Sequence, residues 1–66
     1  MQPKSIEYDI GRDAYGRPVT LTFRRNYDGK ELWSIHSEPT NQRDDGERMD
    51  GLTADNLRAL AAAVST

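Results

Sequence analysis

Cysteine is absent from the chain, histidine occurs once, and no apolar run is long enough to span a membrane. Without cysteine there is neither a disulfide framework nor a thiolate site for a metal, and a single histidine is a poor nucleus for a transition-metal site. No signal peptide is recognisable, so the sequence predicts a soluble protein of the cytoplasm with no membrane partner. We therefore expect neither a metal nor any other cofactor.

An excess of positive charge is also missing. The 66 residues carry eleven acidic and nine basic side chains, which gives a net charge of −2. A chain of this sign has no overall electrostatic attraction to nucleic acid or to an anionic membrane. Its length allows one small domain, residues 1–66 with an ordered part of about 5–64. A domain of this size is only marginally stable unless something adds to its core.

The centre of the chain, residues 17–38, has the pattern of a β-hairpin. Apolar and polar residues alternate in two runs, 19–23 and 33–35, as they do in strands with one buried face. Between the runs lies Asp28-Gly29, a strong turn signal. We therefore predict two antiparallel strands joined by a short turn.

The apolar pattern also selects the length of the turn. A three-residue loop over 27–29, with Gly29 in the left-handed conformation, places Phe23 opposite Trp33 on one face. A two-residue loop would move these two rings to opposite faces, because a slip of one residue turns a whole strand over. The sequence thus favours the three-residue loop, a type I turn followed by a G1 bulge.

A further strand is expected before this hairpin. Apolar residues alternate with polar and acidic ones over residues 5–12. A four-residue turn over 13–16 would pair Arg12 with Arg17, and this register agrees with that of the central hairpin. The agreement between the two registers predicts a three-stranded antiparallel meander.

The polar segment 39–50 allows two interpretations. It contains a second turn signal, Asp45-Gly46, and no clear alternation. A short fourth strand over 47–51, with Met49 facing inward, is one possibility, and a loop is the other. The sequence leaves both open.

The end of the chain has the signals of a helix. Thr53 is a good N-cap, and Asp55 lies near the positive end of the helix dipole. Leu57, Leu60 and Val64 then fall on one face at helical spacing. These features predict a helix of about three turns.

Together these elements predict an α+β fold, a three- or four-stranded antiparallel meander covered on one face by a single C-terminal helix. The expected core comprises Ile6, Tyr8, Ile10, Val19, Leu21, Phe23, Trp33, Ile35, Leu57, Leu60 and Val64.

The opposite, outer face of the predicted sheet carries a serine, a histidine and an aspartate. The register places Asp9 and His36 in one row, with Ser34 nearby. Asp9 and His36 would be two strands apart, roughly 10 Å, and a flat face supplies neither oxyanion donors nor exclusion of water. We therefore predict no catalytic residues and a protein that is not an enzyme.

Arginines and aromatic residues cluster near the predicted turns and are the candidates for binding a partner. Such side chains suit protein interfaces and stacking on nucleic-acid bases. In the structural alternative, Arg25 pairs with Glu31 and the tyrosines only cap the turns. The candidates, most of them expected at one end of the hairpins, are Arg12, Tyr15, Arg17, Arg24, Arg25, Tyr27 and Leu32.

The order of three turn motifs carries a family resemblance. Gly29-Lys30, then Asp45-Gly46-Glu47, then Gly51-Leu52-Thr53 opening a leucine-bearing helix, resembles the positive-cofactor-four-like transcriptional coactivator domains over about residues 19–64. The resemblance implies a ββββα dimer that binds single-stranded nucleic acid across its sheet. Where that family usually has lysines before the glycine at the helix entry, this chain has Met49-Asp50.

Two functions are therefore expected. The first is a small non-enzymatic protein-interaction module, a regulator or inhibitor of the phage type, which binds another protein, itself as a homodimer, or both. Unprotected strand edges and the absence of catalytic chemistry support it. The alternative is a single-stranded nucleic-acid-binding protein, which the resemblance and the arginines support.

Overall fold

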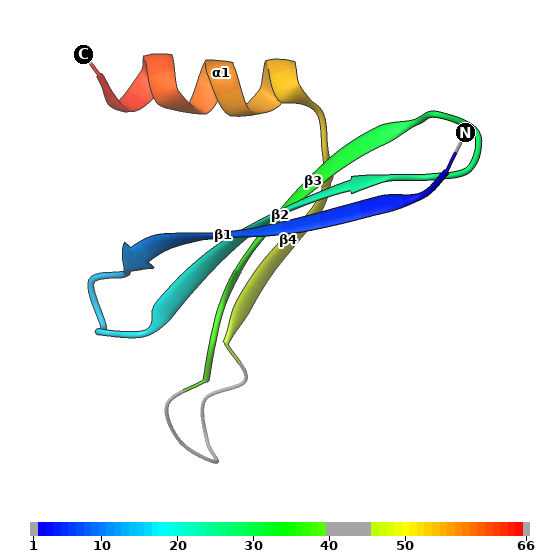
Figure 1. Ribbon diagram of the computed structural model, residues 1–66. Helices are drawn as coiled ribbons and strands as arrows, with labels where there is room; N and C mark the ends of the chain where they lie inside the picture. Colours follow the sequence, from blue (N-terminus) through cyan, green and yellow to red (C-terminus); the bar gives the residue numbers. More distant parts are fainter. Residues whose placement is uncertain (1, 40–45, 66) are drawn as a thin grey trace.

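The computed structural model describes residues 2–39 and 46–65 and has four strands and one helix (Figure 1). These elements are β1 (Lys4–Arg12), β2 (Pro18–Arg25), β3 (Glu31–Ser37), β4 (Glu47–Leu52) and α1 (Ala54–Val64). The strands form one antiparallel sheet in the order β1-β2-β3-β4. The predicted α+β meander with a C-terminal helix is confirmed, and the fourth strand is present. Most of the turn signal at Asp45-Gly46 lies outside the described residues.

The central hairpin has the predicted three-residue loop. The Asn26 amide donates to the carbonyl of Lys30 at 3.0 Å, and the Gly29 amide donates to the carbonyl of Asn26 at 3.0 Å. Gly29 has φ 84°, a backbone angle that residues other than glycine rarely adopt. Phe23 is consequently the strand partner of Trp33, and their ring centroids lie 4.9 Å apart.

The first hairpin repeats the same turn, which the sequence interpretation had made one residue too long. The Asp13 amide donates to the carbonyl of Arg17 at 3.0 Å, and the Gly16 amide donates to the carbonyl of Asp13 at 3.1 Å. Gly16 has φ 81°. The loop therefore has three residues, and Asp13 rather than Arg12 lies opposite Arg17.

A bulge in β1 restores the predicted register beyond this turn. Arg12 pairs with Pro18, whereas Tyr8 pairs with Leu21 as expected, so β1 contains one extra residue between Asp9 and Arg12. Gly11, with φ 98°, lies in this bulge. The predicted pairing of Arg12 with Arg17 was wrong. The shorter loop shifts the register by one residue and the bulge shifts it back, so the apolar pattern is the same with or without these two changes.

Register makes one face of the sheet apolar. Residues directly opposite each other share a face, and two apolar rows cross all four strands. The rows are Ile6–Phe23–Trp33–Leu52 and Tyr8–Leu21–Ile35–Met49. Met49 lies on this apolar face, as predicted for the fourth strand.

The helix begins at the predicted cap. The Asn56 amide donates to Oγ1 of Thr53 at 3.1 Å, and the Thr53 amide donates to Oδ1 of Asn56 at 3.0 Å. This capping box satisfies two amides at the start of the helix, and Asp55 lies in the first turn. Just before the cap, Gly51 has φ 71° and lies in a bulge of β4, where the chain turns toward α1.

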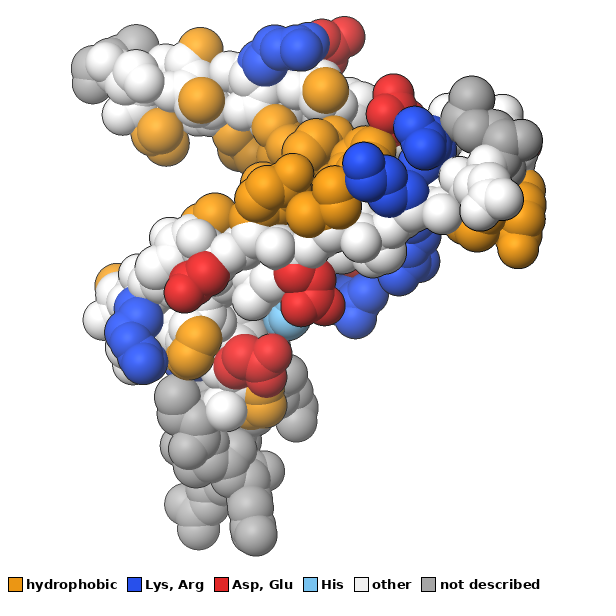
Figure 2. Space-filling model, in the orientation of Figure 1, with side chains coloured by type: hydrophobic (Ala, Val, Ile, Leu, Met, Phe, Trp, Pro, Cys, Tyr) orange, Lys and Arg blue, Asp and Glu red, His pale blue; other side chains and the backbone are white. Residues whose placement is uncertain are grey.

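Packing departs from the expected core. Figures 1 and 2 show α1 running away from the sheet rather than lying flat on it, with hydrophobic side chains gathered where the two diverge. Leu57 is half-buried, but Leu60 is 44% and Val64 83% exposed. No hydrophobic side chain in residues 2–39 and 46–65 is buried, and the only buried residue there is Arg17. Most of the predicted core residues therefore lie on one side of the sheet but are left uncovered. The prediction was wrong for Ile10, which lies at the β1 bulge and is 51% exposed, and for Val64.

The molecule accordingly has an unusually large surface for its mass. Its accessible area is 5297 Å² at 7.5 kDa, whereas a compact monomer of this mass exposes about 4,250 Å². Its radius of gyration is 13.5 Å, against about 11 Å for a compact chain of this length. The chain as a whole thus exposes roughly 1,000 Å² more than a compact monomer of its mass. Helix α1 is too short to cross a membrane, and no other helix occurs in the described residues.

The two aromatic partners at the centre of the apolar face provide a test of the register. Because Phe23 is only half-buried, Phe23→Ala should lower the free energy of unfolding by about 2 kcal/mol, less than the 3–5 kcal/mol typical of fully buried rings. Urea unfolding followed by Trp33 fluorescence measures this change. The control is Tyr27→Ala, since Tyr27 is 78% exposed. Equal losses for the two variants would contradict a central Phe23–Trp33 pair.

Candidate functional site

The meander separates the predicted partner-binding residues into two groups. Successive turns of an antiparallel sheet lie at opposite ends, and β2 has eight residues, a length of about 25 Å. Residues 12–17 therefore lie at one end, here called the Arg17 end, and residues 24–27 at the other, here called the Tyr27 end. The expectation of one basic and aromatic cluster at a single end was wrong for this reason.

At the Arg17 end, Arg17 is a structural residue. Its side chain is 9% exposed, and its Nε donates to Oδ2 of Asp13 at 2.7 Å. Its terminal nitrogen lies 3.7 Å from Oε1 of Glu47, and its guanidinium carbon lies 5.3 Å from the centre of the Tyr15 ring. Arg17 thereby links the first turn to the start of β4, and it is not available to a partner.

Asp13 is the counterpart of Arg17 in this turn. Its Oδ1 accepts hydrogen bonds from the amides of Tyr15 and Arg17, both at 2.9 Å. Partial burial by itself would raise the pKa of Asp13, but the Arg17 and Tyr15 hydrogen bonds and the Arg17 charge outweigh it and lower the pKa below its usual value. The carboxylate is therefore held ionised as part of the turn.

The remaining candidates at the Arg17 end differ in their exposure. Nη1 of Arg12 donates to the carbonyl of Gly16 at 2.7 Å, so Arg12 closes over the same turn. Tyr15 is 81% exposed. Of the three predicted residues here, Arg12 and Tyr15 are exposed and Arg17 is buried.

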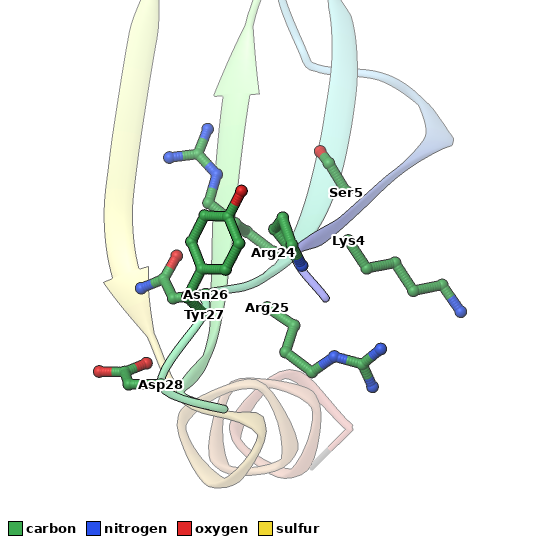
Figure 3. Close-up of a pocket in the computed structure, with 8 residues that line it drawn as sticks. Lys4, Ser5, Arg24, Arg25, Asn26, Tyr27 and Asp28 are labelled. Atoms are coloured by element: carbon green, nitrogen blue, oxygen red, sulfur yellow. The ribbon is translucent and has the colours of Figure 1, made fainter. Parts of the chain in front are cut away.

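At the Tyr27 end, the structure adds a cation that the sequence interpretation missed. Lys4 is the strand partner of Arg25 and joins Arg24 and Tyr27 around a shallow hollow (Figure 3). The register of β1 against β2 was the signal that could have placed Lys4 here. The hollow is lined by Pro3, Lys4, Ser5, Arg24, Arg25, Asn26, Tyr27 and Asp28.

The cations of this hollow do not converge. Arg24 and Arg25 are neighbours in β2 and point to opposite faces, and Figure 3 shows Arg24 beside Tyr27 while Lys4 and Arg25 extend away from it. Arg25 is the strand partner of Glu31, as predicted. Yet within the described residues no ion pair involves Arg25, and its shielded Nε has no hydrogen-bond acceptor.

Leu32 lies on the outer face and is half-buried rather than fully exposed. It pairs with Arg24 and lines a hollow that also contains Arg48 and Asp50. Nε of Arg48 lies 2.8 Å from Oδ1 of Asp50, so these charges neutralise each other locally. Leu32 is thus an apolar patch within a polar face.

The outer-face row forms as predicted and does not resemble a catalytic triad. Asp9 pairs with Thr20, and Thr20 pairs with His36. The Asp9 carboxylate accepts from the Gly11 amide at 3.0 Å, whereas Nε2 of His36 lies 3.4 Å from Oε1 of Glu38. Among the described side chains, no cluster of three or more histidine, aspartate or glutamate residues could hold a metal ion.

A groove between α1 and the sheet is a further feature that the sequence did not predict. Val19, Ile35 and Met49 line it from the sheet, and Leu60 lines it from the helix. We call this surface the apolar groove. Its rim at the Arg17 end is polar and includes Asp13, Ser37 and Glu47. The sequence analysis predicted that most of the apolar residues of this groove belong to a closed core. The orientation of α1 shows that they line an open surface instead.

The Asp13 contacts predict a specific dependence of stability on pH. A carboxylate whose pKa is lower in the folded state stabilises the fold above its unfolded pKa, near 3.9, and this stabilisation is lost as the pH falls through the folded value. Asp13→Asn should therefore destabilise the protein at pH 7 and reduce the further loss seen below about pH 4.

Chemical denaturation from pH 7 to pH 2 measures this effect. Asp28→Asn is the matched control, because Asp28 accepts from the Lys30 amide at 2.9 Å in the second turn but, within the described residues, has no guanidinium partner. If both variants had the same pH profile, the Arg17 contact would not be what stabilises Asp13.

Comparison with protein-family models, with curated proteins and with solved structures finds no match to this chain. The likeness to the coactivator domains therefore remains a prediction.

Proposed function

We propose that this chain is a small non-enzymatic protein-interaction module of the regulator or inhibitor type, and that a second polypeptide completes its fold at the apolar groove. One observation carries this proposal: among the described residues, no hydrophobic side chain is buried. The sheet and the helix nonetheless bring these side chains to one side. An apolar surface assembled in this way is typical of an interaction site.

The open groove also supports binding on energetic grounds. Each Å² of apolar surface that a partner removes from water contributes about 25 cal/mol, from which the cost of association is subtracted. Domains of this size rarely gain more than about 3–5 kcal/mol from their own core. A partner that covers the groove therefore adds to a small intrinsic stability.

The outer face supports a role without catalysis. Asp9 and His36 are each engaged with neighbours in sequence and lie two strands apart, about 10 Å. The face around them is an open sheet, which neither excludes water nor directs donors at a reacting atom.

The accessibility of the groove can be measured with a fluorescent apolar dye. At nanomolar protein concentration, the wild-type chain should bind the dye. Leu60→Asp should weaken binding at least about tenfold, because a carboxylate in an apolar groove disfavours the complex by more than about 1.4 kcal/mol. Ala62→Asp, on an exposed part of the same helix, is the control and should bind the dye like the wild type. Absence of dye binding by the wild type would show a closed groove and refute the proposal.

Binding of single-stranded nucleic acid is the second candidate function. The observation in its favour is that Lys4, Arg24 and Arg25 have no ion pair within the described residues, beside a Tyr27 that is 78% exposed. Cations with an exposed aromatic ring suit phosphates and a stacked base. The net charge of −2 and the divergence of these side chains favour the protein-interaction module instead.

Salt titration separates the two functions. If Arg24 contacts a phosphate, Arg24→Ala should reduce the salt dependence of binding to a labelled oligothymidylate by about 0.7 of a counterion. Arg12→Ala, at the opposite end, should leave that dependence unchanged. We expect negligible binding at physiological salt. A Kd of about 1 µM or tighter under those conditions would make nucleic-acid binding the better proposal.

A further inference from the structure

We infer that the polypeptide that fills the apolar groove is a second copy of this chain, an inference that rests on the proposed function. The accessible area of 5297 Å² exceeds that of a compact monomer by roughly 1,000 Å². A standard interface buries about 800 Å² on each partner. The excess, summed over the whole chain, is of the same size as one side of such an interface.

The composition of the surface is that of an interface. Val19, Ile35, Met49 and Leu60 give it an apolar centre, and polar side chains such as Ser37 surround it. An apolar centre with a polar rim is the usual anatomy of a stable contact between proteins. Leu60 and Met49 are 44% and 53% exposed in a single copy, so both are available to a partner.

The helix provides the part that a second copy would insert. Val64, at the end of α1, is 83% exposed, and Figure 1 shows this end of the helix projecting away from its own sheet. In a two-fold dimer, the same surface of each copy contacts the other. The C-terminal half of α1 in each copy then packs on the apolar face of its partner.

The charges at the two ends of this face are complementary under that symmetry. Lys4 and Arg25 lie on the apolar side at the Tyr27 end, and Glu47, with a side chain 80% exposed, lies at the Arg17 end. When two copies pack with their strands antiparallel, the Tyr27 end of one meets the Arg17 end of the other. Arg25, which has no ion pair among the described residues, then faces Glu47 of the second copy.

The edges of the sheet are less suited to self-association. The β1 edge carries a bulge near Gly11 and the charges of Glu7 and Asp9, and the β4 edge is interrupted by the bulge at Gly51. Bulges and charges on an edge strand oppose continuous pairing with another strand. The apolar face therefore favours the dimer more than the edges do.

Light scattering and sedimentation at micromolar concentration test the dimer. The wild type should have twice the 7.5 kDa mass of one chain. Leu60→Asp should raise the Kd of the dimer at least about 100-fold, because the carboxylate would be buried without a partner. Ala62→Asp should remain a dimer.

A mixing experiment tests the antiparallel arrangement. Arg25→Glu alone places two like-charged pairs in the dimer, and so does Glu47→Arg alone. Each variant should therefore dimerise at least about tenfold more weakly than the wild type. An equimolar mixture should restore dimers, because in the mixed dimer both pairs are again of opposite charge. Circular dichroism of each variant checks that the sheet is retained.

The outcomes separate this inference from the proposed function. Dimers that are lost in Leu60→Asp and restored by mixing support the inference. Wild-type monomers that bind the apolar dye would overturn the second copy as partner and leave the interaction module intact. Wild-type monomers that bind no dye would overturn both. Dimers that persist in Leu60→Asp would place the contact elsewhere and overturn the inference.

Discussion

Two turns with the same hydrogen-bond pattern set the register of the sheet, and the apolar face follows from that register. Each turn has three residues and ends in a glycine with positive φ, Gly16 or Gly29. Because strand side chains alternate, a change of one residue in either loop would send half of the apolar residues to the wrong face. The first loop by itself would shift the pairing of β1 with β2 by one residue, and the bulge at Gly11 restores this pairing. Two complete apolar rows across four strands are the result.

One apolar face and one short helix do not make a closed core. α1 has eleven residues, about 16 Å in length, and it runs away from the sheet after Leu57. A four-stranded sheet needs a full layer on its apolar side before its side chains are buried. In a single copy that layer is incomplete, and the unfilled space is the apolar groove. The proposed function and the proposed dimer both follow because part of the layer that would cover the apolar face is missing.

The arginines show how the same residue type takes different roles in one small sheet. Arg17 is held by Asp13 and lies near Glu47, so its charge is neutralised and serves the fold. Arg25 lies on the apolar side without an ion pair among the described residues, so its charge remains available to a partner. The sequence alone does not distinguish the role of Arg17 from that of Arg25, since each lies within two residues of an apolar strand position. The difference arises from which carboxylates the turns bring close.

Sequence patterns were sufficient to predict the first three strands, the helix, the pairing of Phe23 with Trp33 and the cap at Thr53. Alternation, turn glycines and capping residues act over a few neighbouring positions, so they can be read without knowing the fold. The folded structure was needed to show that 47–52 forms β4, that the short first loop and the β1 bulge compensate each other, that the basic residues lie at two ends, and that the groove beside Leu60 is open. Each of these features depends on contacts between distant segments. The sequence pattern of an apolar strand face is the same whether the helix of the same chain covers that face or leaves it exposed.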